Sequence, residues 1–110
     1  MVVMTIRVGV PKRKRQELFQ TLQALRDSTR REQGCLTSRI YTETQDEDSV
    51  YLVEEWLLQS DLDRHIQSND FAVLFGALTL LQSEPALELR ILAPTGGLEA
   101  IEAVRKRSSG

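Results

Sequence analysis

The sequence predicts an α+β fold in which helices cover one face of a single antiparallel sheet. Four segments alternate apolar and polar residues with the two-residue period of a strand: residues 2–10, 35–44, 50–58 and 85–92. The longer segments after the first and the third of them carry apolar residues at helical spacing. A chain of 110 residues corresponds to one domain by length, so we expect these elements to share one core.

The first strand is followed at once by a long helix. The alternation starts at Val2 and stops at Pro11, because proline lacks the N–H that a strand ladder requires. From Lys12 a helix of roughly six turns should run to Gly34, which can adopt the left-handed conformation that closes a helix. The run KRKR at residues 12–15 opposes the dipole of this helix. We therefore expect an acidic surface of the same or a neighbouring subunit to offset it.

The remaining elements complete the order β-α-β-β-α-β. The second and third strands form a hairpin around an acidic turn. Ser60 with Asp63 matches a capping box, which opens a short helix ending near Asn69. Residues 68–70 then cap a second helix that is apolar around most of its circumference, and a last strand follows. This order is the signature of the ferredoxin-like arrangement.

The sheet face away from the helices is expected to form a dimer contact. By alternation this face carries Arg7, Arg39, Tyr41, Glu88 and Arg90. Two such faces can stack, and polar side chains between them would hold the sheets apart around one pocket per subunit. The apolar second helix also exceeds what one copy can bury. We therefore expect a homodimer whose two sheets form an α+β barrel.

The ends and the composition of the chain restrict its class. Residues 1–93 should form the domain, and residues 94–110 a tail with one or two helical turns before a frayed end. No apolar run reaches the roughly 20 residues of a membrane span, and one histidine with one cysteine, Cys35, leaves no zinc-ligand set. The net charge of -2 argues against nucleic acid, and KRKR more often marks a solvated helix start than a phosphate contact. We expect a cytoplasmic protein without nucleic-acid or membrane partners, in which Cys35 is a small buried hydrophobe.

Four stretches of the sequence resemble a known family. They are EQGCLTSRIYTE at residues 32–43, VEEW at 53–56, LDRHIQSNDF at 62–71 and LELRIL at 87–92. Together they resemble the antibiotic biosynthesis monooxygenase-like family of dimeric α+β barrels, which includes small quinol monooxygenases. The similarity spans about residues 1–93. The resemblance implies oxidation of a quinol or hydroxyaromatic substrate with O2, without flavin, haem or metal.

Relatives of this family carry out other chemistry on the same fold. Haem-degrading members have a tryptophan, a histidine and an asparagine where this chain has His65, Phe75 and Arg7. The resemblance therefore implies that no haem is bound. Two alternatives stay open: an isomerase of a small signal metabolite, and an accessory dimer that binds a small molecule without turnover.

His65, the only histidine, is the candidate catalytic base. Oxidation by O2 requires the substrate hydroxyl to lose a proton, and histidine titrates at about 6.5. The resemblance favours this role, and the alternative is a half-exposed structural histidine bonded to a backbone carbonyl or a nearby acid. Tyr41 and Arg39 are candidates for positioning the substrate oxygen and stabilising its anion. Alternatively, they form cross-sheet ion pairs at the dimer interface with Glu43, Glu54 or Glu88.

The remaining pocket candidates depend on which face of the third strand meets the cavity. If Glu54 and Trp56 face it, Trp56 forms a wall for an aromatic substrate and Glu54 is a polar partner. The resemblance favours this orientation. If the other face meets the cavity, Trp56 is core beneath the first helix. Arg7, Phe71 and Phe75 complete the predicted substrate pocket.

Overall fold

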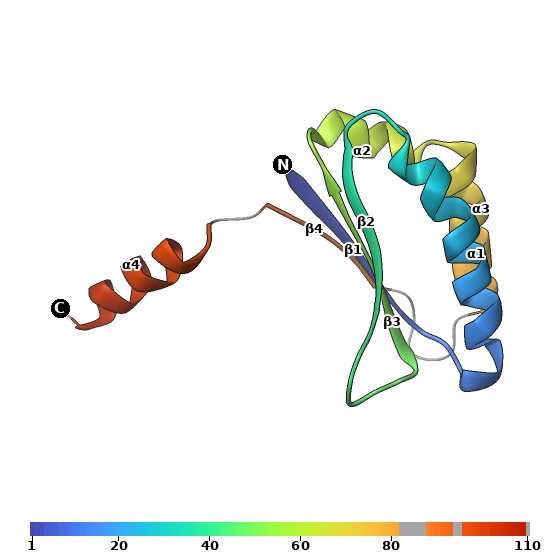
Figure 1. The fold of residues 1–110 in the computed structure, drawn as a ribbon, viewed down its shortest axis with the longest axis horizontal. Helices are drawn as coiled ribbons and strands as arrows, with labels where there is room; N and C mark the ends of the chain where they lie inside the picture. The colour runs from blue at the N-terminus through green and yellow to red at the C-terminus, as the bar shows by residue number, and fades with distance from the viewer. Residues whose placement is uncertain (82–87, 94–95, 110) are drawn as a thin grey trace.

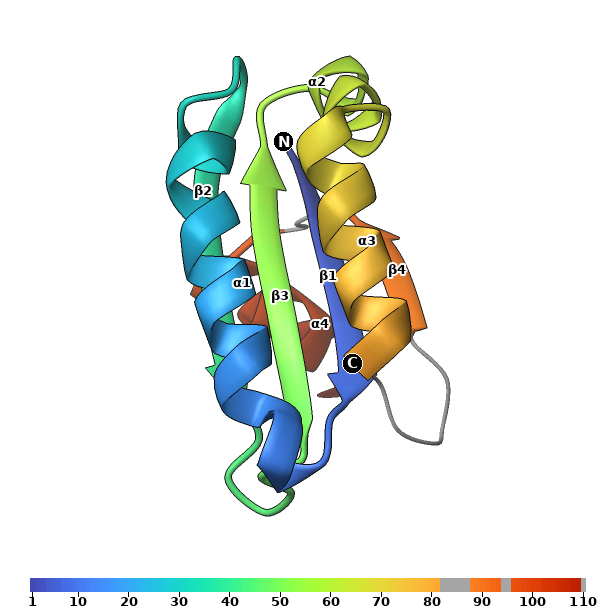
Figure 2. The same ribbon diagram turned by 90° about the vertical axis from the view of Figure 1, so that its right-hand side faces the viewer.

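The computed structural model describes residues 1–81, 88–93 and 96–109, which contain a four-stranded antiparallel sheet. The elements are β1 (Val2–Gly9), α1 (Lys12–Arg30), β2 (Cys35–Thr42), β3 (Ser49–Trp56), α2 (Gln59–Ile66), α3 (Asn69–Leu81), β4 (Glu88–Leu92) and α4 (Leu98–Ser109). The strands lie in the order β2-β3-β1-β4, and α1 and α3 lie side by side over one face (Figure 1, Figure 2). This confirms the ferredoxin-like α+β fold. Residues 85–87 of the predicted fourth strand lie outside the described residues.

The register of the sheet decides which side chains meet the helices. β1 pairs with β3, so that Ile6 lies opposite Leu52, and with β4, so that Met4 lies opposite Ile91. Paired residues point to the same face, and along each strand the face alternates. The even-numbered residues of β1 and β3 therefore lie under α1 and α3, and the odd-numbered residues form the open face.

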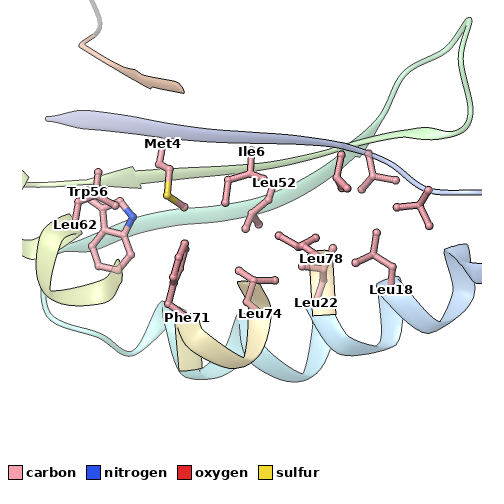
Figure 3. Packing of buried hydrophobic residues seen from close by; sticks show 13 residues of the cluster. Met4, Ile6, Leu18, Leu22, Leu52, Trp56, Leu62, Phe71, Leu74 and Leu78 are labelled. Atoms are coloured by element: carbon pink, nitrogen blue, oxygen red, sulfur yellow. The ribbon is translucent and has the colours of Figure 1, made fainter. Parts of the chain in front are cut away.

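Apolar side chains between the sheet and the two long helices form the core (Figure 3). α1 contributes Leu18 and Leu22, and α3 contributes Leu74 and Leu78. A spacing of four residues places each pair on one face of its helix. Burying one such leucine stabilises the fold by about 1.5 to 3 kcal/mol relative to leaving it exposed, so this layer holds both helices on the sheet.

α1 begins where it is predicted but ends at Arg30, short of Gly34. After Arg30 the chain tightens into a turn, in which the N–H of Arg31 donates to the carbonyl oxygen of Ser28 at 3.2 Å. Gly34 has the left-handed φ of 84°, but at the start of β2. A Cβ at this position would lie 2.1 Å from Oδ2 of Asp61. Glycine is therefore required here both by this left-handed φ and by the close approach of α2, and it does not end α1.

The cations at the start of α1 are offset within the same chain. Nη2 of Arg15 lies 2.6 Å from Oδ1 of Asp48, and its Nη1 lies 3.9 Å from Oε2 of Glu47. Both acids belong to the turn between β2 and β3, which the fold brings to the N-terminal end of α1. The expectation of an acidic surface in the same subunit is therefore confirmed for Arg15.

α2 starts earlier and ends earlier than predicted. Its first residue is Gln59, and no side chain caps its N-terminus, so the capping box of Ser60 and Asp63 is wrong. Ser60 lies inside the first turn, and Asp63 instead accepts a hydrogen bond from Nε2 of Gln59 at 2.9 Å. The helix ends at Ile66 rather than near Asn69.

α3 has the predicted N-terminal cap. Oγ of Ser68 accepts a hydrogen bond from the N–H of Phe71 at 3.1 Å. The outer side of this helix leaves Val73, Phe75 and Leu80 exposed. One copy of the chain therefore buries only part of this apolar helix.

α4 is longer than the one or two turns predicted for the tail. It spans 12 residues, which is roughly three turns. Figures 1 and 2 place it on the other side of the sheet from α1 and α3. Leu98, Ile101 and Val104 form an exposed apolar row along it.

Candidate functional site

A buried histidine between two glutamates is the main polar feature of the core. His65 of α2 is 2% exposed and Glu54 of β3 is 1% exposed. Nδ1 of His65 lies 2.5 Å from Oε2 of Glu32, and Nε2 lies 3.2 Å from Oε1 of Glu54. We call these three residues the histidine cluster. His65 thus contacts acids, as the structural alternative expects, but it is buried rather than half-exposed.

Three separate elements bring the histidine cluster together. His65 lies on the buried side of α2, together with Leu62. Glu54 occupies an even position of β3, on the face under the helices. Glu32 follows α1 in the turn, where its N–H donates to the carbonyl oxygen of Thr29 at 3.1 Å. The backbone of the fold therefore sets the position of each of the three side chains.

Two aromatic rings enclose the imidazole of His65. Trp56 stacks on it with ring centroids 4.7 Å apart, and the edge contact with Phe71 has centroids 5.4 Å apart. Nε1 of Trp56 donates to Oε1 of Glu54 at 3.3 Å. Figure 3 shows Trp56 directed from β3 toward Leu62 and Phe71. These rings exclude water, which strengthens the electrostatic interactions between the charged groups.

The surroundings of His65 favour its protonated form. Burial by itself lowers the pKa of the imidazole, but the contact with Glu54 and the charges of Glu54 and Glu32 outweigh burial and raise the pKa above its ordinary value of 6.5. Nε2 is close to Glu54 but lacks the alignment of a hydrogen bond with any described group. Glu32 holds the ring at Nδ1, and Nε2 is the ring nitrogen without an aligned partner among the described groups.

Glu54 and Trp56 lie on the helix-covered face of the sheet. Glu54 pairs with Met4 and Trp56 pairs with Val2, and the side chain of Met4 is fully buried under the helices. The interpretation that this face of β3 lines a cavity between two stacked sheets is therefore wrong. Trp56 is core, as the other interpretation expects, and its ring stacks on His65 of α2.

Arg7, Arg39 and Tyr41 lie on the open face, as alternation predicts. Tyr41 is 47% exposed. Nη2 of Arg7 donates to Oγ of Ser49 at 3.0 Å, whereas Arg39 forms no hydrogen bond or ion pair with any residue that the structure describes. Within one copy of the chain, the sheet separates these three side chains from His65.

The other predicted residues divide between the inside and the outside of the core. Phe71 contacts His65, whereas Phe75 is half-exposed on the outer side of α3. Cys35, expected to be a small buried hydrophobe, is partly buried and packs against the core. Burial, assisted by the charges of Glu54 and Glu32, raises the pKa of its thiol to about 11. The thiol therefore stays protonated at neutral pH and is a poor nucleophile.

The sequence pattern does not single out Glu32, a member of the histidine cluster, or Ser38, which contacts it. Oγ of Ser38 donates to Oε2 of Glu54 at 3.5 Å. The register of the hairpin pairs these two residues, but a bulge between Cys35 and Thr37 shifts that register and hides it from the sequence. No periodicity relates Glu32 to α2, because the contact spans 33 positions.

The described residues contain neither a candidate metal site nor a candidate membrane-spanning helix. Among them, no group of three His, Cys, Asp or Glu side chains could hold a metal ion. None of the described helices combines the length and the apolar composition of a membrane span. The histidine cluster is chemically suited to proton transfer, because it places an imidazole between two carboxylates and beside the rings of Trp56 and Phe71.

Solved structures share this fold. A conserved protein from Methanosarcina mazei Go1 is 26% identical, with a TM-score of 0.80 over 86% of this chain and 92% of that chain. Rv0793 from Mycobacterium tuberculosis is 25% identical, with a TM-score of 0.78 over 88% of this chain and 97% of that one. A mutant of SnoaB, a cofactor-independent oxygenase from Streptomyces nogalater, is 16% identical, with a TM-score of 0.77 over 88% and 95%. The likeness to SnoaB shows the fold alone.

The sequence also matches a family model. No curated protein matches the chain. The family model described as antibiotic biosynthesis monooxygenase matches residues 1–75, more than half of the chain. The chain therefore belongs to the antibiotic biosynthesis monooxygenase family.

Proposed function

We propose that the chain is a cofactor-independent monooxygenase that oxidises a quinol or hydroxyaromatic substrate with O2. The observation that carries the proposal is the imidazole of His65, which Glu32 holds at Nδ1 and whose Nε2 has no aligned partner among the described groups. Membership of the family supports it. The shared fold of SnoaB, which is described as a cofactor-independent oxygenase, supports it further.

In this mechanism His65 removes the proton of the substrate hydroxyl. The proton moves to Nε2, and Glu32 stabilises the imidazolium that forms. The substrate anion then transfers an electron to O2, and the resulting radical and superoxide combine at a ring carbon as a peroxide. Cleavage of the O–O bond leaves one oxygen atom on the ring. The other oxygen leaves as water with two hydrogens of the substrate.

The neighbours of His65 have separate roles in the proposal. Trp56 and Phe71 form walls for the substrate ring, and Glu54 accepts a hydrogen bond from its hydroxyl. Tyr41 and Arg39 lie across the sheet, so they would act on the substrate from outside the histidine cluster. Phe75, exposed on α3, has no place beside His65 within one copy.

A homodimer is part of the same proposal. On the open face, a hollow of about 400 Å³ is lined by Arg7, Tyr51 and Arg90, among others. A second sheet stacked on this face would enclose the hollow, and Arg7 would then contact a ligand there. The exposed apolar row on α4 supports self-association, because a single copy leaves it in water.

Oxygen consumption with a panel of quinols and phenols tests the function. His65→Gln keeps a polar side chain beside Glu32 but removes the base, and we expect it to lower kcat by about 100-fold or more. Gln67→Ala, on the exposed end of the same helix turn, is the control and should keep full activity. Equal rates for the unmodified protein and His65→Gln would remove His65 from the mechanism.

One observation favours a second function, binding of a small molecule without turnover. The void beside Glu54 has a volume of only about 10 Å³, so in this conformation no substrate fits next to the histidine cluster. Calorimetric binding of panel members that consume no O2 would support this alternative. No observation on the described residues favours an isomerase over it.

A further inference from the structure

Two spaces lie on either side of Arg26, at the seam between α1 and β2. The outer space is a hollow of about 400 Å³, lined by Phe19 and Arg26 of α1 and by Arg39 and Tyr41 of β2. The inner space is the void of about 10 Å³, which has room for about one water molecule and reaches Glu54. Arg26 is the residue that lines both spaces.

Side chains of α1 close the seam between these spaces. β2 is an edge strand of the sheet, and none of the described strands pairs with its outer side. Instead, Nε of Arg26 donates to the carbonyl oxygen of Ser38 at 3.1 Å, and Nη2 of Arg30 donates to the same oxygen at 3.2 Å. A rotation of the Arg26 side chain would break one of these two bonds and join the outer hollow to the inner void.

The outer hollow offers a planar anion two cations and two aromatic rings. Arg39 has no partner among the described residues, and Arg26 uses only its Nε. Guanidinium groups bind carboxylates through paired hydrogen bonds and stack on aromatic rings. The aromatic residues Phe19 and Tyr41 also line this hollow. An aromatic ring that bears an acidic group matches this set of side chains.

The inner void favours a hydroxyl group at the other end of this aromatic acid. The carboxylate of Glu54 lines it, and this group repels an acid but accepts a hydrogen bond from a hydroxyl. A hydroxyaromatic acid would therefore lie with its acidic group outward, at Arg26 and Arg39. Its hydroxyl would point inward, toward Glu54 and His65.

We propose that the seam between α1 and β2 is the entrance to the histidine cluster and that the substrate is a hydroxyaromatic acid, whose acidic group binds Arg26 and Arg39. This inference rests on the proposed monooxygenase function and names its substrate class. It makes Arg26 a specificity-determining residue. It also places Arg39 and Tyr41 at the mouth of the site rather than beside His65.

The indole N–H of Trp56 gives a direct test, because Trp56 is the only tryptophan and its N–H contacts Glu54. The NMR signal of this group is followed while two probes, 4-hydroxybenzoate and the neutral 4-hydroxybenzyl alcohol, are titrated. Both probes should shift the signal. The acid should bind about tenfold more tightly, the effect of one charge-assisted hydrogen bond, and Arg26→Gln should reduce this preference to the part that Arg39 contributes.

Two control variants separate recognition of the acid from loosening of the seam. Arg30→Gln removes a bond to the same carbonyl oxygen, but Arg30 lines neither space. Arg13→Gln removes an exposed cation of α1. Both variants should keep the preference for the acid. Equal affinities of the unmodified protein for the two probes, or an equal loss of preference in Arg26→Gln and Arg30→Gln, would overturn the proposal.

The entrance and the monooxygenase function can fail separately. A preference for the acid that depends on Arg26, in a protein that consumes no O2 with any phenol, would support the entrance and contradict the function. Consumption of O2 with hydroxyaromatic acids at a KM that Arg26→Gln leaves unchanged would contradict the entrance alone.

Discussion

Both faces of the sheet hold polar side chains, but those on one face are buried and those on the other are exposed. On the face under α1 and α3, Glu54 is almost fully buried and lies against His65. On the open face, Arg39 and Tyr41 are exposed, and Arg39 has no partner among the described residues. A buried charge requires a fixed partner, because water cannot stabilise it, whereas an exposed charge is stabilised by solvent.

This contrast assigns different tasks to the two faces. The covered face holds an imidazole in one position with its proton-accepting atom defined, which suits proton transfer. On the open face, Arg39 has no partner among the described residues and is available to a ligand or a second copy. Chemistry and recognition are therefore expected on opposite sides of β2 and β3, joined at the seam beside Arg26.

The largest expected effect distinguishes the two faces by stability. His65→Ala leaves the carboxylate of Glu54 buried without its cationic partner, which we expect to lower the free energy of unfolding by about 3 to 5 kcal/mol. Arg39→Ala, on the open face, should change it by less than about 0.5 kcal/mol. Urea denaturation followed by circular dichroism measures both values. Losses of similar size in the two variants would contradict the contrast between the faces.

The next effect is a pH dependence that only the covered face should produce. The pKa of His65 is raised in the folded state, so its protonation stabilises the fold. This contribution is complete below the ordinary pKa of 6.5 and is lost as the pH rises through the raised value. The stability difference between the unmodified protein and His65→Gln should therefore shrink as the pH rises above 6.5 and through the raised pKa of His65.

Activity should follow the opposite direction over the same range. Only the neutral imidazole accepts a proton, so the rate of O2 consumption should rise with pH as His65 loses its proton.

Arg39→Ala is the control for the pH dependence of stability, because the stability of this variant should keep the pH dependence of the unmodified protein. A stability difference that grows with pH would mean that the pKa of His65 is lowered in the fold.

The smallest effect concerns the helices that close the covered face. Ser68→Ala removes the acceptor for the N–H of Phe71 and should cost about 1 kcal/mol of stability. Ser60→Ala, at the predicted cap that the structure does not form, should be close to neutral because Ser60 lies inside α2. The urea midpoints of the two variants compare their stabilities directly. A larger loss of stability in Ser60→Ala than in Ser68→Ala would support the capping box at Ser60.

Sequence patterns predict the strands and the fold well, because each strand has one apolar face. The alternation of β1 and β3 survives in the structure, where Met4, Ile6, Val50 and Leu52 are buried. The end of α1 is less predictable. Gly34 has the conformation typical of a helix end, but it precedes β2 instead, and the nearby Asp61 of α2, which is distant in sequence, also leaves no room for a side chain there.

The histidine cluster is only partly predictable from the sequence. His65 and Trp56 stand out as single residues of their kind, but Glu54 and Glu55 place one acid on each face of β3. Only the pairing of Glu54 with Met4 decides which acid is buried. Glu32 is further out of reach, because its contact with His65 arises from the packing of α2 against the turn after α1.

The most direct test of the histidine cluster is an NMR titration of His65, which is the only histidine and gives one set of imidazole signals. If Glu32 and Glu54 hold the ring as described, its pKa lies above 6.5, and Glu32→Gln lowers that pKa. A pKa at or below 6.5 in the unmodified protein, or one that Glu32→Gln leaves unchanged, would contradict the arrangement on which the proposed chemistry depends.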